Sequence, residues 1–491
     1  MTQPAGGPGV RTLGATPERW GLWLEGAEQV SESRAVAEVV APFDGRTLAQ
    51  VEQATAEDVD RAVAIAAAAF GDNRRTPGHV RAGWLRAAAA DLAAHADQLA
   101  DAIVAVLGKP VRLASAEVRR APFLLEHCAE EIARMSGDHL PLDAVVGGEG
   151  RWGFTRREPY GVIAAVTPFN APVNLLLQKV APALAMGNAV IVKPAPEGAL
   201  AALQVCEVLS RHLPPGLLNV VCGGPETATA LVSHSTVRAV TLTGGVAAGE
   251  AVLASAGIKP VLLELGSNSP NIVCADADLA DAAERIAVAA FGASGQQCIS
   301  AQRVLVDVSV LDAFLEQFVS HSRNLVVGDP ADPSTDIGPV VNERARERVL
   351  AHIEDAEERG GKVVLDGRRD GLMLGPTVVR DAPRGSRLWR EEVFGPVALV
   401  CSVADVDEAI ERANDSELGL QASCFTSSLA TAMRVAEDVR AGVVWINEAT
   451  RFRLDTYPFG GFGRSGVGRE GVRSAMEELS QVKFVGMRPH S

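Results

Sequence analysis

Short apolar runs alternate with longer amphipathic stretches in the middle of the chain, between Gly161 and Gly266. The apolar runs are rich in β-branched residues and lie at Val162–Val166, Ala189–Val192, Leu218–Val221, Val237–Leu242 and Val261–Leu265. The stretches between them have helical length and lie at about Val173–Ala185, Gly198–Arg211, Glu226–Ser233 and Ala247–Ala256. This alternation predicts an α/β fold with a parallel, doubly wound sheet. Ligands of such sheets bind at the carboxyl ends of the strands.

The flanking segments predict further helices and a second α/β series. Thr55 and Asp58 resemble a capping box ahead of a first helix, and helical stretches follow at roughly Val80–Leu107 and Val111–Met135. After Ser267 helices and strands alternate again, at about Ala280–Gly292, Val304–Val306, Leu311–Asn324, Asn342–Arg359, Val397–Val400, Val406–Asn414, Ala430–Ala441 and Val443–Ile446. The simplest interpretation is that the chain forms two α/β domains with small extra elements.

Two segments lack a periodic pattern. The start of the chain, where Gly6, Gly7, Pro8 and Gly9 lie close together, is expected to be loosely ordered. The stretch from about Asp138 to Arg157 is polar and rich in glycine, so it forms a boundary or an excursion from the main fold.

Composition narrows the class of protein. The 491 residues carry a formal net charge of −15, which disfavours binding to nucleic acid or to an anionic membrane surface. The seven cysteines include no CxxC pair, so the sequence predicts neither a zinc ribbon nor another metal site. Scattered cysteines, the lack of a signal pattern at the N-terminus and the lack of a long apolar run together predict a cytoplasmic protein.

Two residues are candidates for covalent and acid–base chemistry. Cys298 follows a loop rich in glycine and serine, where converging backbone N–H groups favour a thiolate nucleophile, although most cysteines are inert buried residues. Glu264 lies in the apolar run Val261–Leu265, where burial would raise its pKa and suit it to general-base work. The alternative for Glu264 is a strand-end carboxylate that points to solvent.

Glycines after the fourth predicted strand are candidates for phosphate binding. Thr243, Gly244 and Gly245 follow that strand and precede a helix, so the backbone N–H groups could approach a phosphate. A tight turn without a ligand has the same pattern. Lys193 follows the second strand, where a cofactor ribose could lie, although a solvated lysine is commoner there.

Taken in order, several motifs resemble those of the aldehyde dehydrogenase superfamily, from about residue 35 to the end. They are Pro168-Phe169-Asn170, Lys193-Pro194, Thr243-Gly244-Gly245, Glu264-Leu265-Gly266, Gly295-Gln296-Gln297-Cys298, Glu391-Glu392-Val393-Phe394-Gly395-Pro396 and Pro458-Phe459-Gly460-Gly461. The resemblance implies a Rossmann-like cofactor domain, an α/β catalytic domain and a small β-arm for oligomerisation.

The resemblance also implies catalytic roles. Cys298 would attack the aldehyde, and the Asn170 side chain together with the Cys298 backbone N–H would stabilise the oxyanion. Glu264 would activate the water that hydrolyses the thioester, which favours release of a free acid over transfer to coenzyme A.

For the cofactor, the resemblance implies NAD, with NADP also permitted. The implied contacts are Thr167, Phe169, Lys193, Pro196, Gly224, Thr243, Gly244, Gly245, Leu265, Glu392 and Phe394. Two of them depart from the family pattern. Pro196 occupies the position of a glutamate that binds the ribose hydroxyls in NAD-preferring members, so no carboxylate there repels a 2′-phosphate. Gly245 occupies the position of a serine.

For the substrate, the resemblance favours a small polar or anionic aldehyde, of the hydroxy, carboxy, phospho or phosphono kind. The neighbourhood of Glu264 and Cys298 is most similar to lactaldehyde, glyceraldehyde and phosphonoacetaldehyde members, whereas Gln178 and Gly292 disfavour succinic semialdehyde. The implied substrate contacts are Ala171, Gln178, Gln297, Ile299, Arg451, Arg453 and Phe459. Arg451 and Arg453 could bind an anion bidentately. Alternatively, one pairs with Asp455 and the other faces solvent or a neighbouring subunit.

The implied domains are a cofactor domain at 1–137 and 158–260, a catalytic domain at 261–450 and an arm at 138–157 and 474–491. Within the arm, the segment Asp138–Arg157 is expected to pair with the C-terminal run Leu479–Val485, and the arm is expected to build a homodimer or homotetramer. Two other classes of function stay open at this point: a non-redox thiol hydrolase or acyltransferase, and a non-catalytic binding protein on the same scaffold.

Overall fold

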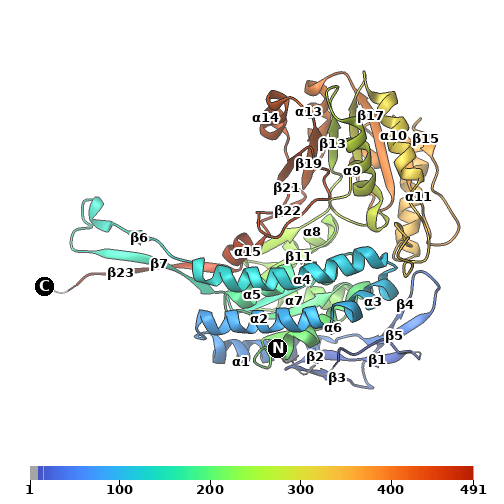
Figure 1. Ribbon diagram of the computed structural model, residues 1–491. Coiled ribbons are helices and arrows are strands. Elements are labelled where there is room, and N and C mark those ends of the chain that lie inside the picture. Colours follow the sequence, from blue (N-terminus) through green and yellow to red (C-terminus); the bar gives the residue numbers. More distant parts are fainter. Residues whose placement is uncertain (1–8, 15, 490–491) are drawn as a thin grey trace, which may run out of the picture.

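The computed structural model describes residues 9–14 and 16–489. Two large sheets with their helices form two lobes, and a slender β-arm extends from the lower lobe, at the left of Figure 1. The start of the chain that was expected to be loosely ordered falls partly on residues 1–8 and 15, which lie outside the described residues. So do residues 490–491 of the predicted arm. In the described part of the chain, every helix is too short or too polar to cross a membrane.

The first sheet has eight strands, and its centre is the predicted parallel sheet. Its order is β22 (Gly466–Val467), β12 (Val261–Glu264), β11 (Val237–Thr243), β8 (Val162–Thr167), β9 (Ala189–Pro194), β10 (Leu218–Val220), β2 (Leu22–Leu24) and β3 (Ala27–Gln29). The strands from β12 to β10 run parallel, and β8 and β9 are buried on both faces, as their continuous apolar sequences require.

Eight helices accompany the first sheet. They are α1 (Ala56–Asn73), α2 (Gly78–Ala94), α3 (Ala96–Leu107), α4 (Val111–Glu131), α5 (Asn174–Ala185), α6 (Ala199–Ser210), α7 (Pro225–Ser233) and α8 (Val246–Ala256). The predicted capping box is confirmed, because Thr55 and Asp58 bond each other's backbone N–H at the start of α1. The stretch Val80–Leu107 is not one helix: it contains parts of α2 and α3, which meet at His95.

The second sheet has seven strands and forms the upper lobe in Figure 1. Its order is β15 (Lys362–Leu365), β16 (Thr377–Arg380), β17 (Val397–Val403), β14 (Arg303–Asp307), β13 (Pro270–Val273), β19 (Gln421–Phe425) and β20 (Val443–Ile446). The remaining helices are α9 (Leu279–Phe291), α10 (Leu311–Arg323), α11 (Glu343–Glu358), α12 (Arg387–Arg390), α13 (Val406–Asn414), α14 (Leu429–Asp438) and α15 (Val472–Glu478).

The arm is a three-stranded antiparallel sheet of β6 (His139–Leu140), β7 (Trp152–Pro159) and β23 (Ser480–Met487). The C-terminal strand pairs along the whole of β7, from Ser480 opposite Pro159 to Met487 opposite Trp152. This is the pairing expected for the run Leu479–Val485. Its role in assembly stays a prediction.

The elements confirm the sequence-based expectation only in part. Strand β12 pairs with β11, as expected for the run Val261–Leu265, so the first sheet reaches Glu264, and the domain bounds stay a prediction. There was no signal in the sequence for a small sheet of β1 (Glu18–Trp20), β5 (Thr47–Glu52) and β4 (Val36–Val40), nor for the pair β18 (Leu418–Gly419) and β21 (Phe462–Gly463). These strands are short, and pairing with distant segments decides their conformation.

Candidate active site

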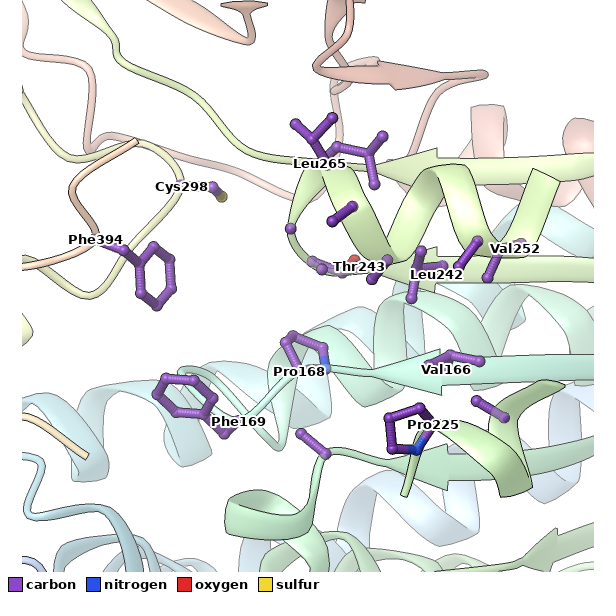
Figure 2. A pocket seen from close by; sticks show the side chains of 18 of the residues that line it. Val166, Pro168, Phe169, Pro225, Leu242, Thr243, Val252, Leu265, Cys298 and Phe394 are labelled. Carbon is purple, nitrogen blue, oxygen red and sulfur yellow. The ribbon is translucent and has the colours of Figure 1, made fainter. Parts of the chain in front are cut away.

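A cavity of about 910 Å³ lies at the carboxyl ends of β8, β9 and β11, where the first sheet faces the second lobe. All of the residues expected to contact the cofactor line it: Thr167, Phe169, Lys193, Pro196, Gly224, Thr243, Gly244, Gly245, Leu265, Glu392 and Phe394. Figure 2 shows Cys298, Phe394 and Phe169 at one end of the cavity, and Val166 and Val252 toward the other. Cys298 and Asn170 also line it.

The cavity fits a dinucleotide in chemistry as well as in size. Helix α8 begins at the cavity, so its positive end and the backbone of Gly244 and Gly245 could hold a pyrophosphate. The Thr243 hydroxyl lines the cavity and is buried without a hydrogen-bond partner among the described residues. Burial lowers the pKa of Lys193, and no ion pair with a described residue involves its ammonium group. These groups could take up phosphate and ribose oxygens.

Pro196, which stands where NAD-preferring members carry a glutamate, lies in the part of the cavity expected to hold the adenosine ribose. Pro196 begins a short 3-10 helix that directly follows β9, and Glu197 comes next. Oε1 of Glu197 accepts a hydrogen bond from Nδ2 of Asn342 at 2.9 Å. Because Asn342 lies at the start of α11, this bond links the two lobes at the rim of the cavity. The only carboxylate beside Pro196 in sequence is thus already engaged.

Glu392 and Phe394 lie at the end of the cavity near Cys298. Oε1 of Glu392 accepts a hydrogen bond from the backbone N–H of Ser267 at 3.0 Å. Burial raises the pKa of Glu392 from 4.5 to about 7. Phe394 has a φ of +49°, an unfavourable value for a residue with a side chain, and its ring contacts Phe169 edge-on with centroids 5.9 Å apart. This strained turn directs Phe394 into the cavity.

A second strained segment precedes Cys298. Ala293 and Ser294 have φ values of +54° and +57°, and Gly295 has +65°. The Ser294 hydroxyl donates to the carbonyl oxygen of Gly338 at 2.9 Å, and Oε1 of Gln296 accepts from the Val341 N–H at 3.0 Å. Such strain persists only where the surroundings fix it, and it is common at functional sites. The loop therefore holds the thiol in a defined position at the cavity.

The resting thiol of Cys298 is protonated at neutral pH. Burial, together with the negative charges of Glu392 and Glu264, raises the pKa of Cys298 to about 12, although the charge of Arg453 opposes this rise. A nucleophilic role for Cys298 therefore requires a base or a change in its surroundings when ligands bind.

Asn170 lies three residues beyond the end of β8 and faces the cysteine loop. Its Nδ2 donates to the carbonyl oxygen of Gln296 at 2.9 Å. An amide NH₂ group has two hydrogens, so one remains for another acceptor, in an orientation that the first bond fixes. The arrangement suits the expected oxyanion donor.

Glu264, the last residue of β12, is buried and does not point to solvent as the alternative required. Both of its carboxylate oxygens are buried without a hydrogen-bond partner among the described residues. Burial and the charge of Glu470 raise its pKa well above 4.5, whereas Arg453 and Lys179 oppose this rise. A carboxyl group with a raised pKa is suited to accept a proton as a general base.

A buried ion-pair cluster lies behind Glu264. Glu470 accepts hydrogen bonds from Nζ of Lys179 at 2.7 Å and from Nη2 of Arg453 at 2.8 Å. Burial alone would raise the pKa of Glu470, but the two cations outweigh it and lower that pKa. Arg453 also stacks on the ring of Phe459 at 3.8 Å from the centroid. The cluster keeps Arg453 beside the thiol and the base.

The two candidate arginines differ in their partners. Arg453 pairs with Glu470 and not with Asp455, whose carboxylate pairs with Arg120 and accepts from Nε2 of Gln178. The proposed Arg–Asp455 pairing is therefore wrong for both arginines. Nε of Arg451 donates to Oε1 of Gln297 at 2.9 Å, and no described carboxylate lies within ion-pair distance of it. Burial lowers the pKa of Arg451 to about 10.

None of the predicted substrate residues, all within the described part of the chain, is among those that line the dinucleotide cavity. Ile299 packs with Phe459 in a small buried cluster that Cys298 also contacts. Gln178 is buried on α5, and Ala171 follows Asn170 as a half-buried residue. The structure thus brings the predicted catalytic residues and the two arginines to one region.

Sequence reasoning missed part of the cavity wall. One face of α7, a largely exposed face of α8 and the start of α11 line it, through Pro225, Ala228, Thr229, Val232, Val246, Ala247, Ala248, Ala251, Val252, Val341, Asn342, Arg344, Ala345 and Arg348. Small residues on α8 were the available signal, since they allow a ligand to approach the helix. Among the described residues, no group of His, Cys, Asp or Glu side chains could hold a metal ion.

A dinucleotide-sized cavity at the carboxyl ends of a parallel sheet, with a thiol and a buried carboxyl group at one end, is typical of a nucleotide-dependent oxidoreductase with a reactive cysteine. A family model described as "Aldehyde dehydrogenase family" matches residues 29–485. The chain belongs to the aldehyde dehydrogenase family and is therefore an NAD(P)-dependent oxidoreductase rather than a non-redox thiol hydrolase or a binding protein.

Individual relatives agree with this family over nearly the whole chain. The chain is 37% identical over 470 residues to a 3-sulfolactaldehyde dehydrogenase of Priestia megaterium, covering 95% of this chain and 98% of the relative. It is 39% identical over 449 residues to an aspartate-semialdehyde dehydrogenase of Pseudomonas canavaninivorans, with 91% and 96% covered. The NADP complex of an NADP-dependent glyceraldehyde-3-phosphate dehydrogenase from Bacillus halodurans matches with a TM-score of 0.93 at 34% identity, with 95% and 99% covered.

Proposed function

We propose that the protein oxidises a small polar or anionic aldehyde to the carboxylic acid with NAD(P), through covalent attachment of the substrate to Cys298. The observation that carries this proposal is that Cys298 and Asn170 line the dinucleotide cavity, while the charges of Glu264 and Arg453 act on the Cys298 thiol and Arg451 bonds the neighbouring Gln297. The substrates named for the three relatives (3-sulfolactaldehyde, aspartate semialdehyde and glyceraldehyde 3-phosphate) each carry a sulfonate, carboxylate or phosphate group, which supports a polar or anionic aldehyde here.

Each catalytic side chain has one task in the proposed reaction. When ligands bind and change the surroundings of Cys298, its thiol releases its proton to water and the sulfur bonds to the aldehyde carbon. The free amide hydrogen of Asn170 and the backbone N–H of Cys298 donate to the oxygen that becomes negative. Bound NAD(P) supplies the hydride acceptor. Glu264 takes a proton from the water that cleaves the resulting thioester, and the thiol leaves as the acid forms.

Unpaired polar atoms support a polar substrate. Nε of Arg453 and Oε1 of Gln178 are buried without a hydrogen-bond partner among the described residues. Arg451 is half-buried and has no carboxylate within ion-pair distance in the same part of the chain. Buried polar groups of this kind are costly unless a ligand satisfies them, so an apolar aldehyde would suit the site poorly.

A panel of aldehydes assayed with both NAD and NADP tests the proposal. Its members would be matched pairs of similar size, one neutral and one carrying a carboxylate, sulfonate or phosphate, and nicotinamide absorbance would be followed. We expect the anionic member of a pair to have the higher kcat/KM. Equal or higher kcat/KM for the neutral members would overturn the substrate class, and no reduction of either cofactor with any aldehyde would overturn the reaction.

We also propose that the arm builds a homodimer or homotetramer, and that the predicted cofactor and catalytic domains act as units around the cavity. Exposed apolar residues on the arm support self-association, namely Val146, Trp152, Val482 and Phe484. Sedimentation velocity at micromolar concentration should show a dimer or tetramer, and a monomer would contradict the proposal.

A further inference from the structure

A buried ion pair lies next to Asn170 and has no part in the proposed chemistry. Nζ of Lys109 lies 2.5 Å from Oε2 of Glu117, and both side chains are almost fully buried. Lys109 belongs to the turn between α3 and α4, and Glu117 belongs to α4. Burying two charges is expensive, so the pair needs further hydrogen bonds to be tolerated.

Those further bonds go to the segment that carries Asn170. Nζ of Lys109 also donates to the backbone carbonyl oxygen of Asn170 at 3.2 Å. Oε1 of Glu117 accepts from the backbone N–H of Val173 at 2.9 Å and of Asn174 at 3.2 Å, where α5 begins. The two charges therefore hold the middle and the C-terminal end of the short segment between β8 and α5.

The same turn contacts the cysteine loop indirectly. Gly108, next to Lys109, packs so closely against Gly338 and Pro339 that a side chain on Gly108 or Gly338 would clash. Gly338 in turn accepts the hydrogen bond of the Ser294 hydroxyl. A small cavity of about 20 Å³ between these parts is lined by Lys109, Asn170, Ser294 and Gln296, among others. The turn thus contacts the Asn170 segment directly, and it contacts the cysteine loop through Gly338.

We propose that Lys109 and Glu117 are positioning residues that fix the backbone of Asn170, so that its free amide hydrogen meets the oxyanion. Neither residue contacts substrate or cofactor; they act through Asn170. The inference rests on the proposed role of Asn170. Because hydrogen bonds to developing charge depend strongly on geometry, a displaced amide lowers kcat with little effect on ground-state binding.

A double-mutant cycle tests the proposal. The pair is removed as Lys109→Met with Glu117→Gln, so that no single charge stays buried and the glutamine oxygen still accepts from the α5 backbone. We expect kcat to fall about tenfold or more, with the aldehyde KM and the NAD(P) dissociation constant nearly unchanged. In an Asn170→Ala background, the same change should lower kcat no further.

A second buried ion pair provides the control. Arg34 pairs with Glu52 and Asp58 away from the cavity, so Arg34→Met should lower the thermal midpoint and leave kcat unchanged. Asn170→Ala with wild-type kcat would overturn the proposed role of Asn170. If Asn170→Ala lowers kcat but the pair's removal lowers it further by the same factor, or leaves kcat unchanged in the wild type, the inference about Lys109 and Glu117 is wrong.

Discussion

Nε of Arg451 lies 2.9 Å from Oε1 of Gln297, the residue that precedes Cys298. The bond joins the loop after β20 to the cysteine loop and leaves the other guanidinium nitrogens without a carboxylate among the described residues. Arg453, two residues later, pairs with Glu470 and stacks on Phe459, and its Nε is buried without a hydrogen-bond partner among the described residues. The two arginines, equivalent in the sequence, should therefore respond differently to substitution.

Arg451→Gln should raise KM for an anionic aldehyde roughly tenfold to hundredfold, because a charged hydrogen bond contributes about 1.5–3 kcal/mol. KM for a neutral aldehyde of similar size should change little, and so should the thermal midpoint. Steady-state kinetics on the pair of substrates checks this. Arg453→Gln is the matched comparison: it leaves Glu470 short of a partner, so we expect a lower thermal midpoint and lower activity with both substrates. An equal loss with both aldehydes in Arg451→Gln would contradict the anion-binding role.

Cys298→Ala should abolish reduction of NAD(P) while the protein still binds the cofactor, because only the sulfur forms the bond to substrate. Nicotinamide absorbance and a fluorescence titration measure the two properties. Cys128→Ala is the control, since Cys128 is buried on α4 and lies outside the cavity lining. Turnover retained by Cys298→Ala, or lost equally in Cys128→Ala, would argue against a nucleophilic Cys298.

Glu264→Gln should leave the first turnover rapid and slow all later ones, because hydrolysis of the thioester needs the base. Rapid-mixing absorbance should show a burst of reduced cofactor of about one equivalent per active site, followed by a slow steady state. Since the pKa of Glu264 is raised, the wild-type steady-state rate should fall as the pH drops through a value above 4.5, where the base becomes protonated. A pH-independent steady state, or no burst in the variant, would contradict this role.

Pro196→Glu should weaken NADP binding more than NAD binding. A carboxylate at this position would repel a 2′-phosphate and could accept from a 2′-hydroxyl, whereas the neighbouring Glu197 is held by Asn342. Dissociation constants for both cofactors, measured by fluorescence, give the ratio. An unchanged ratio would show that the ribose does not lie at Pro196.

Glu392→Gln should change the pH dependence of stability. Burial gives Glu392 a pKa of about 7 in the folded protein against 4.5 as its ordinary value, so the folded state keeps a proton that the unfolded chain releases. Glu392 therefore makes the wild type less stable as the pH rises through that window. The glutamine variant, which can still accept from Ser267, lacks this loss. Thermal midpoints of both proteins on either side of the window should diverge with rising pH, and a constant difference would contradict the raised pKa.

The local signals in the sequence determined much of the fold and the identity of the candidate site. Continuous apolar runs specified the buried parallel strands, Thr55 and Asp58 specified a helix start, and the spacing of Asn170, Glu264 and Cys298 indicated the family. These features depend on neighbouring residues or on motif order, so they can be read along the chain.

Tertiary structure alone decided which groups meet. Arg453 faces Glu470 rather than Asp455, Lys109 and Glu117 hold the Asn170 segment, and α8 lines the cavity, because packing brings together residues far apart in the sequence. Burial raises the pKa of Glu264. Packing also places Arg451 next to Gln297, with no carboxylate within ion-pair distance among the described residues. These pKa shifts and pairings depend on distances between side chains and on exclusion of water, which cannot be predicted from the order of residues alone.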